Sequence, residues 1–135
     1  MNILITGSRS TSPLMLDKAR QVVDWCIANN HSVIVGDAEG IDSEVRRYCH
    51  QKHATCDVFG AYQRFKYPAI GGTMICCDFP NYLARDRHMV SLCDMCVAVW
   101  NGITGGTYYT FTHARKMGKR VIIRRFAVNL THVID

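Results

Sequence analysis

Three short segments of the sequence are rich in small and polar residues, and two of them add acids or arginine, the residue types that build ligand-binding turns. They are Thr6-Gly7-Ser8-Arg9, Gly36-Asp37-Ala38-Glu39-Gly40-Ile41-Asp42 and Asn101-Gly102-Ile103-Thr104-Gly105-Gly106-Thr107. Small residues let the backbone approach a ligand closely, and free N–H groups at a helix N-terminus bind phosphate. The planar guanidinium of Arg9 also suits phosphate. The segments therefore predict a pocket for an anionic ligand, although glycine and serine also occur in turns that are merely tight.

A further candidate lies in the segment from Tyr82 to about Cys93, which has helical spacing. Its apolar stripe is formed by Tyr82, Leu83, Met89, Val90 and Cys93. Asp86 falls near the middle of this stripe, and Arg85 and Arg87 flank it. A carboxylate on a buried stripe is costly unless it is paired. Two interpretations follow: a structural salt bridge, or a pocket floor on which Arg85 binds phosphate and Asp86 orients it.

The elements that must position these residues are strands and helices in alternation. We expect strands at residues 2–6, 32–35, 56–60, 96–100 and 120–124, and helices at residues 13 to about 30, 41–53, 82–93 and 107–117. This alternation requires right-handed parallel crossovers. The predicted fold class is α/β: a Rossmann-like, doubly wound parallel sheet of about five strands with helices on both faces. The three segments then leave one edge of the sheet, where ligands bind.

Helix-capping residues support this division and offer a second reading of some candidates. Ser12 and Pro13 are typical of an N-cap and a first helical residue, and Thr107 is predicted to cap the last helix. Acids near the start of the second helix are stabilised by its dipole, so Asp37, Glu39 and Asp42 could be capping groups. One of these acids could instead accept hydrogen bonds from ribose hydroxyls.

Two parts of the chain fit this pattern less well. Residues 61–80, rich in aromatic residues, glycine and cysteine, are expected to form a loop or small hairpin over one sheet edge, which is a candidate lid. Residues 126–135 are expected to be a C-terminal tail, in which Phe126, Val128 and Leu130 alternate and could add an edge strand or a dimer contact. Residues 1–135 are expected to form one domain.

Composition narrows the function classes. The net charge of +5 suits an anionic ligand but does not choose among nucleotide, nucleic acid and acidic protein. With 48% apolar residues the chain is expected to fold, and the absence of a long apolar run predicts no membrane association. Seven cysteines without a secretory leader predict reduced thiols and a cytoplasmic location.

The cysteines and aromatic residues give weaker indications. Cys93-x-x-Cys96 and Cys49-His50-x-x-His53-x-x-Cys56 have the spacing of metal ligands. Cys93 lies on the apolar stripe, however, and Cys96 begins a predicted strand, so we expect neither a metal nor a cofactor. The tyrosines and phenylalanine that could stack on a base, or fill the core instead, are Tyr62, Phe65, Tyr67, Tyr108 and Tyr109.

Taken in order, Ile5-Thr6-Gly7-Ser8-Arg9, the Gly36–Asp42 segment, Arg85-Asp86-Arg87 and Gly105-Gly106-Thr107 resemble the SLOG superfamily. This superfamily joins the DNA-processing protein DprA, the LOG phosphoribohydrolases and the YspA-like and YpsA-like domains. The YspA-like branch is the most similar, through Asp94 to Val99, Trp100-Asn101-Gly102 and Ala114 to Lys119. The resemblance implies a Rossmann-like fold that binds nucleotides or nucleotide-derived ligands, frequently as a homodimer.

One departure from the superfamily bears on catalysis. LOG enzymes carry a catalytic glutamate a few residues after their glycine-rich turn, but here Tyr108 to Phe111 follow Thr107 without an acid. Hydrolysis of an N-glycosidic bond requires a carboxylate near the sugar. Glu39, Asp42 and Asp86 are the candidates for it.

We therefore hold three hypotheses, led by a sensor or sequestering protein for a nucleotide-derived, possibly cyclic, signalling ligand. The second is a nucleoside 5′-monophosphate phosphoribohydrolase of the LOG type, and the third is single-stranded nucleic acid binding. The predicted ligand contacts are Thr6, Gly7, Ser8, Arg9, Gly36, Asp37, Ala38, Gly40, Asp42, Arg85, Asp86, Trp100, Asn101, Gly102, Thr104, Gly105, Gly106 and Thr107.

Overall fold

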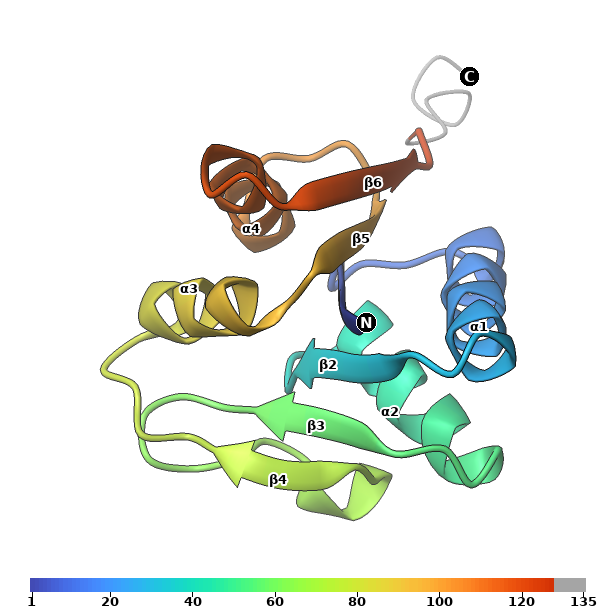
Figure 1. The fold of residues 1–135 in the computed structure, drawn as a ribbon, viewed down its shortest axis with the longest axis horizontal. Coiled ribbons are helices and arrows are strands. Elements are labelled where there is room, and N and C mark those ends of the chain that lie inside the picture. Colours follow the sequence, from blue (N-terminus) through green and yellow to red (C-terminus); the bar gives the residue numbers. More distant parts are fainter. Residues whose placement is uncertain (128–135) are drawn as a thin grey trace, which may run out of the picture.

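The computed structural model describes residues 1–127, which form a six-stranded sheet with helices on both faces (Figure 1). The strands are β1 (Asn2–Gly7), β2 (Ser32–Gly36), β3 (Cys56–Phe59), β4 (Thr73–Cys76), β5 (Met95–Trp100) and β6 (Arg120–Arg125). Their order is β4-β3-β2-β1-β5-β6, and every pairing is parallel. The predicted α/β, Rossmann-like fold class is confirmed.

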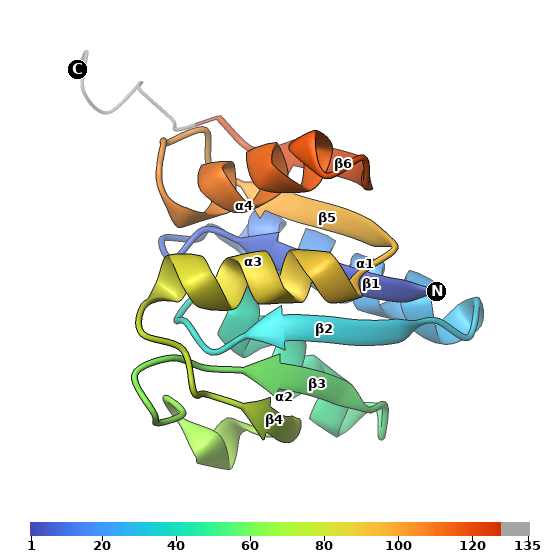
Figure 2. The same cartoon turned by 60° about the vertical axis from the view of Figure 1, so that its left-hand side comes forward.

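Two helices cover each face of the sheet. α1 (Pro13–Ala28) and α2 (Ile41–Gln51) lie on one face, and α3 (Tyr82–Leu92) and α4 (Gly106–Lys116) lie on the other (Figure 2). The strands are buried between these layers because successive side chains point to opposite faces. In β1, Ile3 and Ile5 belong to the core under α1 and α2, whereas Leu4 belongs to the core under α3 and α4.

Local sequence signals account for the start of α1 and the end of α4. The Ser12 hydroxyl accepts a hydrogen bond from the Met15 N–H at 3.4 Å, and Pro13 is the first residue of α1, as predicted. Gly118 follows α4 with a φ of +75°, a left-handed conformation that glycine adopts without strain. Thr107 is not the N-cap of α4, because the helix begins one residue earlier and Gly105 holds the capping position.

The sheet has one strand more than the sequence predicted. Residues 61–80 contain a short 3₁₀ helix (Pro68–Ile70) and the edge strand β4, which pairs in parallel with β3. β4 was missed because it is only four residues long and half of its residues are exposed, so it lacks the apolar run of the central strands. Phe126 packs against the core under α1, whereas the predicted contacts of Val128 and Leu130 lie outside the described residues.

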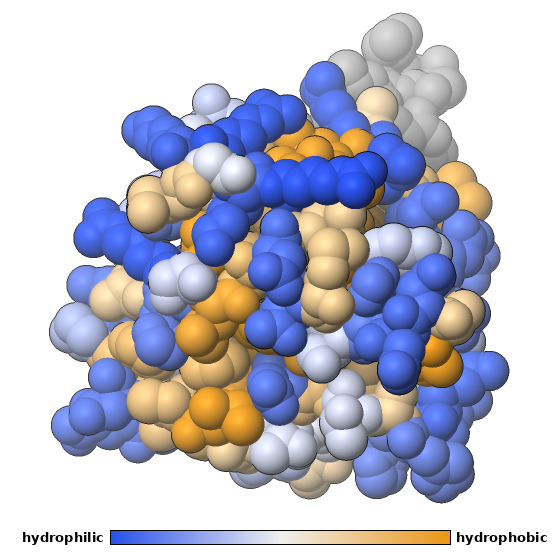
Figure 3. All heavy atoms as spheres, in the orientation of Figure 1, coloured by the Kyte–Doolittle hydropathy of each residue, from blue (hydrophilic) through white to orange (hydrophobic). Residues whose placement is uncertain are grey.

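The opposite edge of the sheet carries positive charge. Figure 3 shows hydrophilic side chains gathered over β6, whose Arg120, Arg124 and Arg125 are exposed. Charged residues on an edge strand discourage pairing with another chain. No helix within residues 1–127 has both the length and the apolar character needed to cross a bilayer.

Candidate functional site

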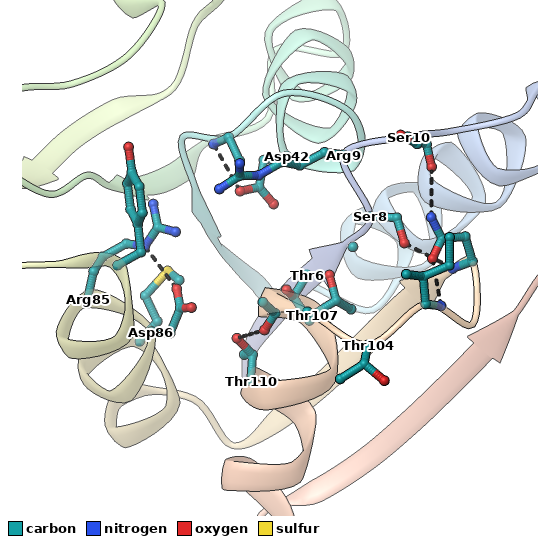
Figure 4. Close-up of a pocket in the computed structure, with 18 residues that line it drawn as sticks. Thr6, Ser8, Arg9, Ser10, Asp42, Arg85, Asp86, Thr104, Thr107 and Thr110 are labelled. Carbon is teal, nitrogen blue, oxygen red and sulfur yellow. Dashed lines mark hydrogen bonds and ion pairs between the residues drawn. The ribbon is translucent and has the colours of Figure 1, made fainter.

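A cavity of about 450 Å³ lies at the carboxyl edge of the sheet, between the loops that follow β1 and β5 (Figure 4). From β1 the sheet continues through β2 in one direction and through β5 in the other, so the cavity is at the switch in strand order. Its lining consists of Thr6, Gly7, Ser8, Arg9, Ser10, Ala38, Asp42, Tyr82, Arg85, Asp86, Met89, Asn101, Ile103, Thr104, Gly105, Gly106, Thr107 and Thr110.

Most of the predicted contact residues line this cavity. The predicted residues outside its lining are Gly36, Asp37, Gly40, Trp100 and Gly102. The lining residues that the sequence prediction missed are Ser10, Tyr82, Met89, Ile103 and Thr110. A helical signal for three of them was available: Tyr82 and Met89 lie three or four residues from Arg85 and Asp86, and Thr110 lies three residues after Thr107.

Two glycines of the second ligand segment permit close approaches, Gly40 to the first segment and Gly36 to Asp42 and Arg85. Gly40 has a φ of +78°, and a Cβ at this position would lie 2.3 Å from the carbonyl oxygen of Ser8. The Ile41 N–H donates to that same oxygen at 3.1 Å. At Gly36, a Cβ would lie 2.7 Å from Oδ2 of Asp42 and 3.2 Å from the guanidinium of Arg85. Gly36 and Gly40 therefore shape the cavity from behind its surface.

The third segment is tied to the first by side-chain hydrogen bonds. The Ser8 hydroxyl accepts from the Asn101 N–H at 2.9 Å, and Asn101 Oδ1 accepts from the Ile103 N–H at 3.0 Å. The Trp100 indole donates to the Ile103 carbonyl at 2.8 Å, and its ring packs edge-on against Phe111. Trp100 thus supports the turn from outside the cavity rather than contributing to its lining.

The N-terminus of α4 borders the cavity without a capping side chain. Gly105 and Gly106 line it, and a Cβ on either glycine would have no atom of residues 1–127 within 4 Å. In this part of the chain, no side chain makes a capping hydrogen bond at the start of the helix. Such N–H groups, together with the helix dipole, attract anions.

Arg85 and the acids around it form a charged floor on the other side. The Arg85 Nε donates to Asp86 Oδ1 at 2.9 Å, and its Nη1 donates to Asp37 Oδ1 at 2.8 Å. The second oxygen of Asp37 accepts from the Lys66 N–H at 2.7 Å. All of Arg85, Asp86 and Asp37 are buried, which the stripe predicted for Asp86; Leu83 of that stripe is exposed instead.

Burial shifts the protonation of these groups. Burial raises the pKa of Asp42 to about 7, against the attraction of Arg85 and a hydrogen bond from the Ala38 N–H. Burial also raises the pKa of Asp86, although Arg85 opposes the shift. Burial lowers the pKa of Arg85, but the carboxylates of Asp86, Asp42 and Asp37 outweigh it and leave that pKa raised. The floor therefore contains a fixed cation and an acid that exchanges its proton near neutral pH.

The catalytic candidates separate into two groups. Glu39 is exposed, lies outside the cavity lining and accepts a hydrogen bond from the Tyr67 hydroxyl at 3.2 Å. Asp42 and Asp86 both line the cavity.

Cys93 and Cys96 are buried in the core under α3 and α4. Within residues 1–127 no three His, Cys, Asp or Glu side chains gather as a metal site would require.

Solved structures of other proteins share this fold. DNA processing protein A from Helicobacter pylori, described for its single-stranded DNA binding mode, matches 96% of this chain and 67% of its own at 17% identity, with a TM-score of 0.71. The molybdenum cofactor carrier protein from Chlamydomonas reinhardtii matches 90% of this chain and 74% of its own at 19% identity, with a TM-score of 0.75. The molybdenum cofactor binding protein from Rippkaea orientalis matches 98% and 80% at 18% identity, with a TM-score of 0.74. No protein-family model matches the sequence, and no curated protein matches it significantly.

Such identities show a shared fold and nothing finer. DprA is among the proteins that the resemblance of the sequence named, so its fold is the one expected. The neighbours bind different ligands according to their descriptions, one a single-stranded DNA and others a molybdenum cofactor. The ligand of this chain must therefore be argued from its own cavity.

Proposed function

We propose that the protein binds a nucleotide or nucleotide-derived small molecule in this cavity, as a sensor or sequestering protein. The observation that carries the proposal is the division of the cavity into two chemically different sides. The uncapped N-terminus of α4 and the side chain of Arg9 attract an anion, whereas Asp42 and Asp86 offer acceptors for hydroxyl groups. A phosphorylated sugar presents both kinds of group at once.

The phosphate belongs at the N-terminus of α4 in this proposal, and the sugar belongs on the floor. Of the two interpretations of Arg85, phosphate binding is not favoured, because two of its nitrogen atoms already donate to Asp86 and Asp37. Asp42 adds a further carboxyl group beside it. A dianionic phosphate would be repelled there, while ribose hydroxyls could donate to the carboxylates.

A second candidate function is N-glycosidic hydrolysis of a nucleoside 5′-monophosphate. Asp42 favours it, because a buried carboxyl group with a pKa of about 7 can donate or accept a proton at neutral pH. Asp86 would then stabilise the positive charge that develops on the sugar. The acid would stand at the start of α2 rather than after the glycine-rich turn, where LOG enzymes carry it.

The resemblance and the neighbours support related proposals. We assign the chain to the SLOG superfamily and its YspA-like branch, and we expect a cytoplasmic homodimer made of a single domain per chain. Single-stranded DNA binding, the activity in the description of the H. pylori neighbour, is the remaining alternative. It predicts an affinity that grows with oligonucleotide length and falls steeply with salt.

One experiment distinguishes these functions. Small molecules released by denaturing the purified protein are identified by mass spectrometry, and the native protein is incubated with AMP, GMP, CMP and UMP. An intact nucleotide without turnover supports the binding protein, and Arg9→Ala should then reduce its retention. Release of free base that is lost in both Asp42→Asn and Asp86→Asn would establish the hydrolase instead. Absence of any nucleotide binding contradicts both.

A further inference from the structure

A second, smaller cavity of about 290 Å³ adjoins the first and shares one wall with it. It is lined by Asp37, Ala61, Tyr62, Arg64, Lys66 and Tyr82. Tyr82 also lines the first cavity, so the two cavities share this residue. The ion pair between Asp37 and Arg85, at 2.8 Å, joins one residue of each cavity.

Among residues 1–127, Asp37 is the acid that lines the second cavity, and both of its carboxylate oxygens accept hydrogen bonds. Asp37 Oδ1 accepts from the Arg85 guanidinium, and Asp37 Oδ2 accepts from the Lys66 N–H. Arg64 and Lys66 form no ion pair within the described part of the chain. The second cavity therefore presents the two positive charges of Arg64 and Lys66 beside the single negative charge of Asp37.

Two tyrosine rings lie beside the cations of the second cavity. Tyr62 and Tyr82 meet edge to face with their ring centroids 5.0 Å apart. Lys66 Nζ lies 5.0 Å from the centroid of the Tyr82 ring, and the guanidinium carbon of Arg9 lies 5.9 Å from it. Tyrosine rings combined with cations are suited to bases joined by phosphates.

The chain segment beside the second cavity contains residues in a left-handed conformation and is held by hydrogen bonds to its backbone. Tyr62, Gln63 and Tyr67 have positive φ values between 52° and 60°, which non-glycine residues rarely adopt. The Tyr62 N–H donates to the Phe79 carbonyl at 2.8 Å and thereby holds this turn against the chain. The fully buried guanidinium of Arg46 donates to the carbonyls of Lys66, Tyr67 and Gly71 at 2.8–3.0 Å.

We propose that the second cavity binds the second nucleotide unit of a dinucleotide ligand. The first unit occupies the first cavity, here called the main cavity. The inference rests on the proposed function, because the first unit must bind for the second to be placed. The phosphate between the units faces the cations around Tyr82, and the second base packs against Tyr62. The proposed ligand class thus narrows from any nucleotide to a dinucleotide, which carries two bases.

The test compares ligands of one and two units by isothermal titration calorimetry on the full chain. The probes are the four 5′-mononucleotides, the four 5′-phosphorylated homodinucleotides, adenosine 3′,5′-bisphosphate and a decamer of the best base. We expect the best dinucleotide to bind at least about tenfold more tightly than its mononucleotide, because it gains the second cavity. The wild-type comparison needs no variant, so it does not depend on any variant folding.

Two variants and a control test whether the extra affinity of the dinucleotide comes from the second cavity. Tyr62→Ala and Lys66→Met should each remove most of the advantage of the dinucleotide and leave the affinity for the mononucleotide unchanged. Lys52→Met is the matched control, since Lys52 Nζ also lies over a tyrosine ring, 5.3 Å from the centroid of Tyr48, but outside both cavities. It should change neither affinity.

Each other outcome contradicts the inference in a recognisable way. Equal affinities for one and two units would overturn it and leave the proposed function standing. If adenosine 3′,5′-bisphosphate bound with the same affinity as the dinucleotide, the second base would contribute nothing to binding. That result would contradict its placement in the second cavity. A decamer much tighter than the dinucleotide would identify the ligand as a nucleic acid strand and overturn the dinucleotide. Failure of every probe to bind would overturn the proposed function as well.

Discussion

The guanidinium Nη1 of Arg85 lies 2.8 Å from Oδ1 of Asp37, although the two residues are 48 positions apart in the sequence. Both side chains are buried, and the pair joins the first turn of α3 to the residue that follows β2. The same guanidinium is bound by Asp86, its neighbour in the chain. Arg85 is therefore first a structural residue of the cavity floor, and it holds the acids around it in place.

Replacement of Arg85 by methionine should destabilise the protein strongly. It leaves the buried carboxylates of Asp37 and Asp86 without their cation, which costs about 3–5 kcal/mol when one partner of a buried pair is removed. The free energy of unfolding is measured by urea denaturation followed by circular dichroism. Arg47→Met is the control, because the side chain of Arg47 is exposed and Glu44 keeps its second cation, Arg20, so the loss should cost less than about 1 kcal/mol. Equal losses would contradict the structural role of Arg85.

Stability should depend on pH through Asp42. Burial raises the pKa of its carboxyl group from 3.8 to about 7, so the folded protein binds this proton more tightly than the unfolded chain does. The resulting stabilisation is fully present below the lower pKa and is lost as the pH rises through the higher one, with a slope of up to about 1.4 kcal/mol per pH unit. Urea denaturation at a series of pH values between these limits measures it.

One variant separates the contribution of Asp42 from that of the other acids in that experiment. Asp42→Asn resembles the protonated carboxyl group and should flatten the slope, leaving the smaller part that the raised pKa of Asp86 contributes in the same direction. An unchanged slope in Asp42→Asn would show that the buried acid does not bind the proton.

Exchange of two glycines for alanine should separate binding from folding. Gly105 lines the main cavity, and an added methyl group there would meet no other atom within 4 Å. Gly105→Ala should weaken AMP binding about tenfold, because the methyl group occupies the phosphate position, while the free energy of unfolding stays within about 0.5 kcal/mol. The affinity is measured by calorimetry. An unchanged AMP affinity would show that the phosphate does not bind at the N-terminus of α4.

Gly118→Ala is the matched control and should do the reverse. Gly118 has a φ of +75° and lies outside both cavities. This left-handed conformation disfavours alanine by roughly 1 kcal/mol, so the variant should lose that much stability and keep its AMP affinity.

Arg46→Lys should loosen the wall of the second cavity. The planar guanidinium donates from three nitrogen atoms to three different carbonyls, and a lysine ammonium cannot reproduce this fork. We expect a loss of stability of about 2–3 kcal/mol and faster amide hydrogen exchange in residues 60–72, while exchange in β1 and β5 stays slow. Hydrogen exchange with mass spectrometric detection checks this, and uniform acceleration throughout the chain would contradict a local role.

The fold was predictable wherever burial leaves a strong pattern in the sequence. The central strands are continuous apolar runs, such as Ile3 to Ile5, because both of their faces are covered. β4 lacked this pattern because it lies at the edge, and it was missed. Ser12 and Gly118 marked helix ends correctly because their chemistry is local.

The site was predictable in its loops and less so in its helices. Glycine-rich turns after strands point to one edge of a parallel sheet, which brought Thr6, Asp42 and Gly105 to the same cavity. Asp37 belongs to the same turn as Ala38, yet its carboxylate faces Arg85 and the Lys66 N–H instead of the main cavity. Such pairing depends on the direction of a side chain, and the order of residues in a loop does not determine that direction.

The position of Trp100 provides an optical signal from the ligand loop. Its indole N–H is bonded to the Ile103 carbonyl in the turn that lines the cavity, whereas the other tryptophan of the chain, Trp25 of α1, packs beside His31. With Trp25 replaced by phenylalanine, the remaining tryptophan fluorescence would arise from Trp100 alone, which is hydrogen-bonded to the turn. Ligand titrations could then be followed by emission without any attached dye.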